Sequence, residues 1–85
     1  MALESIMQLP IINICGTDRQ SLLDQYVLAI HALRESIETL SAASPNGRDY
    51  QHGGSINQAL TEHAVRIVKV RQVLAEIETI AEHIA

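Results

Sequence analysis

The fold is decided by residues 55–85, SINQALTEHAVRIVKVRQVLAEIETIAEHIA. Apolar positions in this stretch recur at intervals of four and three residues, the spacing that lines up side chains along one side of an α-helix. These positions are Ile56, Leu60, His63, Ile67, Val70, Leu74, Ile77, Ala81 and Ile84. Ser55 and Gln58 form an S-x-x-Q capping box at the start of the stretch. A helix over 55–85 is therefore predicted, roughly 45 Å long at about 1.5 Å per residue.

A second heptad pattern lies upstream and predicts a helix over 17–43. Its repeating positions are Leu23, Tyr26, Ile30, Leu33, Ile37 and Leu40. The segment from Thr17 to Gln20 reads as a capping box, with Asp18 in the first turn. The sequence Ser44-Pro45-Asn46-Gly47 ends this helix, because proline disfavours helix in the residue before it and Asn-Gly favours a turn. Two long helices with a short connection predict an all-α antiparallel hairpin.

The composition limits the class of protein. Its 85 residues, with no Phe or Trp, indicate a single helical domain with a core of Leu, Ile, Val and Ala. The formal net charge of -4 argues against general nucleic-acid binding. No stretch resembles a signal peptide or a membrane span, and Cys15 has no second cysteine to pair with, so a cytoplasmic protein without membrane contact is expected. Residues 1–16 read as an apolar arm, extended from Pro10 to Cys15.

More apolar side chains are present than one hairpin can cover. Outside the two heptad patterns stand Leu22, Val27, Leu28, Val65, Val68, Val73 and Ile80. Two helices do not enclose a core, and small chains bury little of their surface. A homo-oligomer, dimer or higher, is therefore expected, most simply a four-helix bundle of two hairpins onto which the arm could swap. The alternative is a monomer with its arm folded over its own hairpin.

The connection over 44–54 concentrates the polar groups capable of specific recognition. Arg48 can hold a phosphate or carboxylate, and Tyr50 can stack on a base. Gly53 and Gly54 precede a helix N-terminus, where an anion is electrostatically favoured. With the neighbouring polar groups, the candidate ligand-binding residues are Asn46, Arg48, Asp49, Tyr50, Gln51, His52, Gly53, Gly54 and His63. The competing interpretation is an ordinary turn with solvated charges, and the glycine pair is not a phosphate-loop motif.

The sequence offers no catalytic constellation and no metal site. His63 on the heptad pattern is typical of a hydrogen-bonded core histidine, although it could support a loop ligand. His52, Asp49 and His63 match no metal-ligand spacing on one helix face, and no nucleophile with a matching base is visible. We therefore expect no enzyme activity, no metal and no cofactor. His31 and His83 are expected to be solvated, and Cys15 to be a buried or interface thiol.

The stretch Asn46-Gly47-Arg48-Asp49-Tyr50, followed by a helix with Glu62-His63 and the run 74–77, resembles short uncharacterised helical proteins of tailed phages and prophages. Those proteins often have a second tyrosine where this chain has Gln51. The resemblance implies a phage accessory protein in the host cytoplasm, and by analogy an oligomer that sequesters a nucleotide signal of host immunity. The alternative is an interaction module that binds and inhibits a host or phage protein through its helices or its arm.

Overall fold

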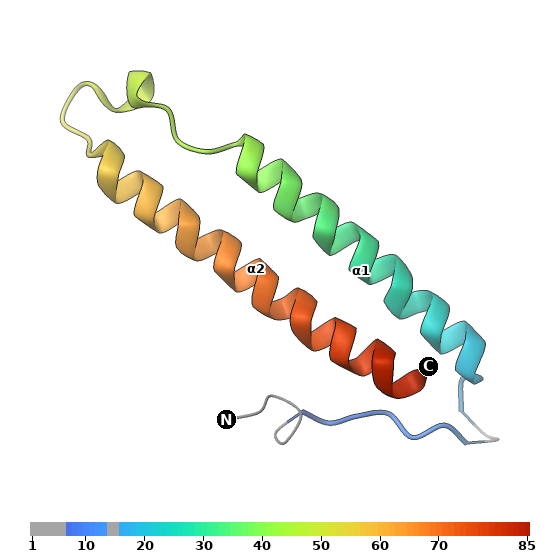
Figure 1. The fold of residues 1–85 in the computed structure, drawn as a ribbon. Helices are drawn as coiled ribbons and strands as arrows, with labels where there is room; N and C mark the ends of the chain where they lie inside the picture. Colours follow the sequence, from blue (N-terminus) through green and yellow to red (C-terminus); the bar gives the residue numbers. More distant parts are fainter. Residues whose placement is uncertain (1–6, 14–15) are drawn as a thin grey trace.

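The computed structural model describes residues 7–13 and 16–85, which form an elongated hairpin (Figure 1). Helix α1 spans Arg19–Ala42, the short 3₁₀ helix η2 spans Gly47–Tyr50, and helix α2 spans Ile56–Ile84. The two long helices run antiparallel, and the described residues contain no strand. The predicted all-α hairpin is thus confirmed. Its radius of gyration is 17.9 Å, whereas a compact chain of this length would have about 12 Å.

Helix α1 begins two residues later than predicted. Asp18, rather than Thr17, is the N-cap: its backbone is extended, and its carboxylate accepts hydrogen bonds from the Ser21 backbone N–H at 3.0 Å and the Ser21 hydroxyl at 2.8 Å. An aspartate satisfies the free N–H groups of a first turn well, so it displaces the weaker threonine cap. These hydrogen bonds hold the pKa of Asp18 below its ordinary value, the backbone N–H of Ser21 contributing most.

The Asp18 cap predicts a specific pH dependence of stability. Because its pKa is lowered in the folded chain, the cap stabilises the fold fully above the unfolded pKa of about 4 and loses this effect as pH falls through the folded pKa. Asp18→Asn keeps a good cap but cannot titrate. In urea unfolding from pH 7 to pH 2.5, the wild type should lose stability relative to Asp18→Asn below about pH 4. Parallel curves for both proteins at every pH would contradict this assignment.

Helix α2 begins as predicted. Ser55 is its N-cap, and the Ser55 hydroxyl accepts from the Gln58 backbone N–H at 3.1 Å. The Gln58 side-chain nitrogen donates to the carboxylate of Glu62 at 3.1 Å. Gln58 in the first turn of α2 is therefore joined to Glu62 in the second turn along the helix surface.

The helix–helix contact follows the predicted heptad positions with one exception. The described residues that are most buried are Ile37 on α1 and Ala59, His63, Ala81 and Ile84 on α2. Leu60, expected in the core, is 42% exposed, and Ala59 takes its place. In a straight α-helix, positions seven residues apart rotate by about 20° around the helix axis. A strict four–three pattern over many turns therefore moves away from the line of helix contact, here at the N-terminal end of α2.

Two polar contacts join the helices at separate levels. Arg34 on α1 forms a salt bridge of 2.8 Å with Glu78 on α2; Arg34 is exposed and Glu78 is half-buried. Nearer the loop, the Nε2–H of buried His63 donates to the backbone carbonyl oxygen of Leu40 at 2.6 Å. That carbonyl lies in the last turn of α1, where backbone acceptors lack helical partners, and it also accepts from the Ala43 N–H. The hydrogen bond of His63 therefore connects the C-terminal end of α1 to α2.

The described part of the arm, residues 7–13, lies beside the C-terminal end of its own α2 (Figure 1). The backbone carbonyl oxygen of Pro10 accepts a hydrogen bond from His83 Nε2 at 3.0 Å. His83 was expected to be solvated. It is exposed, and it also forms this hydrogen bond with Pro10. Cys15 lies outside the described residues. Residues 7–13 of the arm therefore lie against α2 of the same chain.

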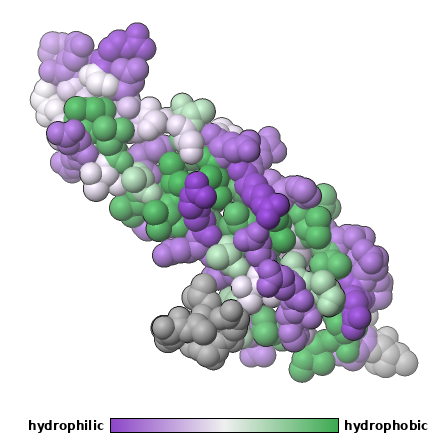
Figure 2. All heavy atoms as spheres, in the orientation of Figure 1, coloured by the Kyte–Doolittle hydropathy of each residue, from purple (hydrophilic) through white to green (hydrophobic). Residues whose placement is uncertain are grey.

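The surface of the hairpin is mixed in character. Figure 2 shows apolar side chains along the middle of one face, crossed by hydrophilic side chains, while the loop end is mostly hydrophilic. Among the described residues, no helix is both long and apolar enough to pass through a bilayer. The largest exposed apolar fractions are those of Ile11 at 84% and Leu28 at 70%.

Candidate functional site

The connection between the helices is a folded structure built on Asn46. Asn46 has an extended backbone, and its side-chain oxygen accepts from the Arg48 backbone N–H at 3.0 Å, which caps η2. The same oxygen lies 3.4 Å from Arg48 Nε. The Asn46 carbonyl oxygen also accepts from the Asp49 N–H at 3.0 Å. The side-chain oxygen of Asn46 therefore contacts both the backbone and the side chain of Arg48.

Tyr50 ends η2 and lies against Gly54. A Cβ atom on Gly54 would come within 3.2 Å of Tyr50 Cδ1, so the ring packs closely on this glycine and a larger residue there would require the ring to shift by a few tenths of an ångström. Gly53 has a φ of +84°, in the left-handed region that favours glycine. Both glycines therefore serve the shape of the loop, which allows the chain to turn under the tyrosine before α2 begins.

A shallow hollow opens between Tyr50 and the first turns of α2. Its lining combines the loop with one side of the helix: Tyr50, Gly53, Gly54, Ser55, Gln58, Ala59 and Glu62. The ring supplies one wall, and the Gln58–Glu62 pair supplies polar groups on the other. A planar ligand with donor groups would fit such a mixture of aromatic and acceptor surfaces.

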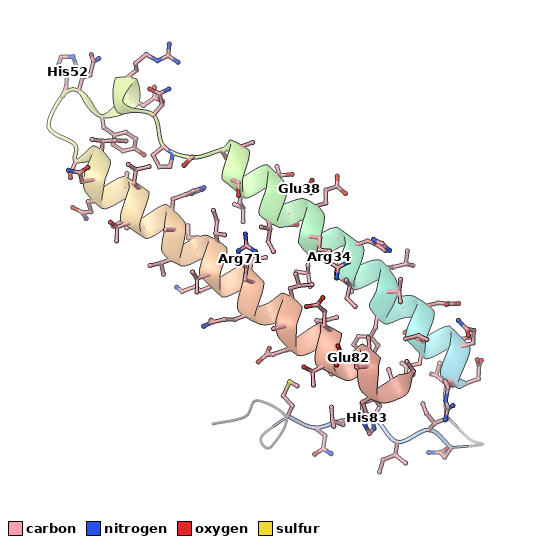
Figure 3. All side chains as sticks on the ribbon, in the orientation of Figure 1. Arg34, Glu38, His52, Arg71, Glu82 and His83 are labelled. Atoms are coloured by element: carbon pink, nitrogen blue, oxygen red, sulfur yellow. The ribbon has the colours of Figure 1, made fainter. Side chains whose placement is uncertain are left out.

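The structure brings only some of the expected residues together. Tyr50, Gly53 and Gly54 line the hollow, whereas Asn46 and Arg48 contact each other on the exposed 3₁₀ turn beside it. Asp49, Gln51 and His52 are exposed, and Figure 3 shows His52 at the tip of the loop, away from both helices. His63 is buried and points to Leu40, as expected for a core histidine.

Sequence reasoning missed the helical half of this hollow. Ser55, Gln58 and Glu62 follow one another at three and four residues, so they lie on one side of the first turns of α2. This spacing could have identified them, but a capping box accounts for Ser55 and Gln58 without any ligand. The Glu62 carboxylate places a negative charge in the hollow itself, so a cation for an anionic group must come from outside the residues that line it, and Arg48 lies on the neighbouring 3₁₀ turn.

Among residues 7–13 and 16–85, no three His, Cys, Asp or Glu side chains gather as metal ligands would. No protein-family model, curated protein or solved structure matches this chain. The function is therefore inferred from the site itself.

Proposed function

We propose that this chain is a non-enzymatic, self-associating protein whose loop over 44–54 binds a small anionic ligand such as a nucleotide. By the resemblance of the loop, it would be a phage accessory protein that sequesters such a ligand as a signal of host immunity. In this proposal Arg48 holds the anionic group and Tyr50 stacks on the ring. Gln51 and His52 contact polar edges from the exposed side of the loop.

The observation that carries the proposal is the defined conformation of the loop beside a hollow. A connection that only reverses the chain needs neither a capped 3₁₀ helix nor an aromatic ring seated on a glycine. Here the Asn46 side-chain oxygen contacts the backbone N–H and the Nε of Arg48, and the ring of Tyr50 packs on Gly54, so contacts within the connection itself orient both side chains. A preorganised loop on a rigid scaffold is a common setting for ligand recognition.

The charges of the site favour a ligand of mixed character. Glu62 would accept hydrogen bonds from exocyclic or ring N–H groups, while its charge would turn a phosphate away from the helix and toward Arg48. A nucleotide carries donor groups on its base and negative charge on its phosphate, at opposite ends of the molecule. It therefore satisfies both halves of this surface.

Replacing Arg48 with alanine should weaken nucleotide binding roughly tenfold or more, since a charge-assisted hydrogen bond is lost. Binding can be measured by calorimetry with a panel of nucleoside monophosphates and dinucleotides, after native mass spectrometry has selected the members that bind. Arg19→Ala, at the opposite end of the hairpin, is the matched control and should bind as the wild type does. Equal affinity of Arg48→Ala and wild type would refute the assignment.

A second candidate function is favoured by the arm. Ile11 is 84% exposed, although it lies close to Pro10, which is held by His83. Both helices expose further apolar side chains, among them Leu28 at 70% and Val68 at 51%, so the arm and the helices together offer apolar surface for contact with another protein. Under this proposal the partner is a host or phage protein, and Arg48→Ala would leave its capture unchanged.

A further inference from the structure

The hairpin exposes more surface than a compact monomer of its mass. Its solvent-accessible area is 6346 Å², whereas a folded monomer of 9.3 kDa has about 5,000 Å². A stable protein–protein interface removes about 600 to 1,000 Å² from each partner. The excess is therefore large enough for one such interface per chain, and the remaining question is which flank of the hairpin supplies it.

The hairpin has two flanks, the two long sides on which α1 and α2 are both exposed. The salt bridge between Arg34 and Glu78 lies on one of them. At about 100° per residue, Ser36 lies about 160° around α1 from Arg34, and Val73 lies about 140° around α2 from Glu78. Ser36 and Val73 therefore share the opposite flank. Both also lie in the stretch between the two interhelical contacts, Arg34–Glu78 and His63–Leu40. We call this region, Ala32–Leu40 on α1 with Thr61–Val73 on α2, the open flank.

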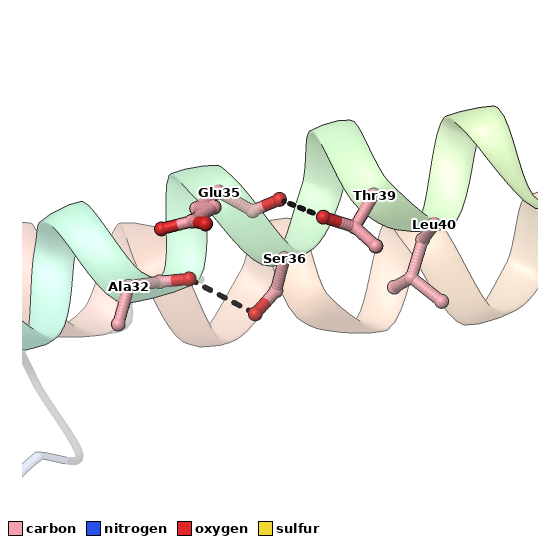
Figure 4. A pocket seen from close by; sticks show the side chains of 5 residues that line it. All are labelled: Ala32, Glu35, Ser36, Thr39 and Leu40. Carbon is pink, nitrogen blue, oxygen red and sulfur yellow. Dashed lines mark hydrogen bonds between the residues drawn. The ribbon is translucent and has the colours of Figure 1, made fainter.

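The α1 side of the open flank is hollowed, as seen in Figure 4. The hollow is lined by Ala32, Glu35, Ser36, Thr39 and Leu40. The Ser36 and Thr39 hydroxyls donate to the carbonyl oxygens of Ala32 and Glu35, at 2.9 Å each, so both side chains lie close to their own helix. Small side chains held against the backbone leave room for a neighbouring side chain to enter.

The α2 side of the open flank carries exposed apolar side chains of a size that can enter such a hollow. Val73 is 44% exposed and Val65 is 47% exposed on this helix. Lys69, which lines a second shallow hollow with Val65, makes no ion pair within residues 7–13 and 16–85. Glu35, at the rim of the α1 hollow, likewise has no charged partner in the described part of the chain. The α1 side therefore offers a hollow with a carboxylate that has no ion-pair partner among the described residues, and the α2 side offers exposed valines with an ammonium group in the same condition.

We propose that a second copy of this chain packs on the open flank, with the two-fold axis along the length of the hairpin. In this arrangement α1 of each copy lies over α2 of the other. Val73 of one copy enters the partner's hollow beside Ser36, and Lys69 pairs with Glu35 across the rim, twice by symmetry. The inference rests on the self-association proposed above and names its surface. It also brings both 44–54 loops to the same end of the dimer.

The matched variants are Val73→Asp on the open flank and Val27→Asp on the flank of Arg34, where Val27 is 38% exposed. In sedimentation velocity over a range of concentrations, Val73→Asp should weaken self-association at least tenfold, and Val27→Asp should not change it. Circular dichroism checks that both variants remain helical.

The charge pair gives an independent test. Glu35→Lys and Lys69→Glu should each weaken self-association, and the double variant should restore it, because it re-forms the pair with its charges exchanged. A wild type that stays monomeric at all concentrations would overturn both the self-association and the surface. Wild-type association that Val73→Asp and both single charge variants leave unchanged would overturn the surface alone.

Discussion

Replacing Ile37 with alanine is expected to lower the free energy of unfolding by about 2 to 4 kcal/mol. Ile37 is 7% exposed and is the most buried of the described residues of α1, so the substitution opens a cavity on the line where the helices meet. In a fold with so few buried side chains, this loss should be a large part of the total stability. Chemical unfolding followed by circular dichroism measures it.

Leu28→Ala is the control for this prediction. Leu28 lies on the same helix and is 70% exposed, so its truncation should change the free energy of unfolding by no more than about 0.5 kcal/mol. Similar losses for Ile37→Ala and Leu28→Ala would show that the helices do not pack along the line that the structure describes.

The second large effect is expected at His63. His63→Ala removes a buried ring and its hydrogen bond to the Leu40 carbonyl oxygen, so unfolding should become easier by about 2 to 3 kcal/mol. Amide hydrogen exchange should rise most in the last turn of α1, which the contact fastens to α2. His63→Gln keeps a donor of similar reach and should recover part of the loss.

His31→Ala is the matched control, because His31 is exposed on the surface of α1. It should leave both the stability and the exchange pattern unchanged. If His63→Ala behaved as His31→Ala does, the hydrogen bond to Leu40 would have no structural role, and a supporting role of His63 toward a loop ligand would deserve a direct binding measurement.

Much of the candidate site could be located from the sequence, but its construction could not. The polar residues of 44–54 mark the loop, and Gly53 and Gly54 mark the approach to the second helix, whereas the positive φ of Gly53 is known only from the structure. The sequence could not tell that the Asn46 side-chain oxygen is occupied by Arg48 or that Glu62 enters the hollow beside Tyr50. Those facts depend on how the loop turns in space, which residue types alone do not specify.

The sequence by itself determined the helices, their antiparallel connection and most of their contact line. These features follow from interactions within a few residues: the cap of Ser55, the break at Pro45, and apolar side chains at four–three spacing. Tertiary structure decided the features that join distant residues. His63 meets Leu40 across 23 residues, Arg34 meets Glu78 across 44, and His83 meets Pro10 across 73. Local spacing places a side chain on one side of its helix, but the rotation and shift of the two helices choose its partner.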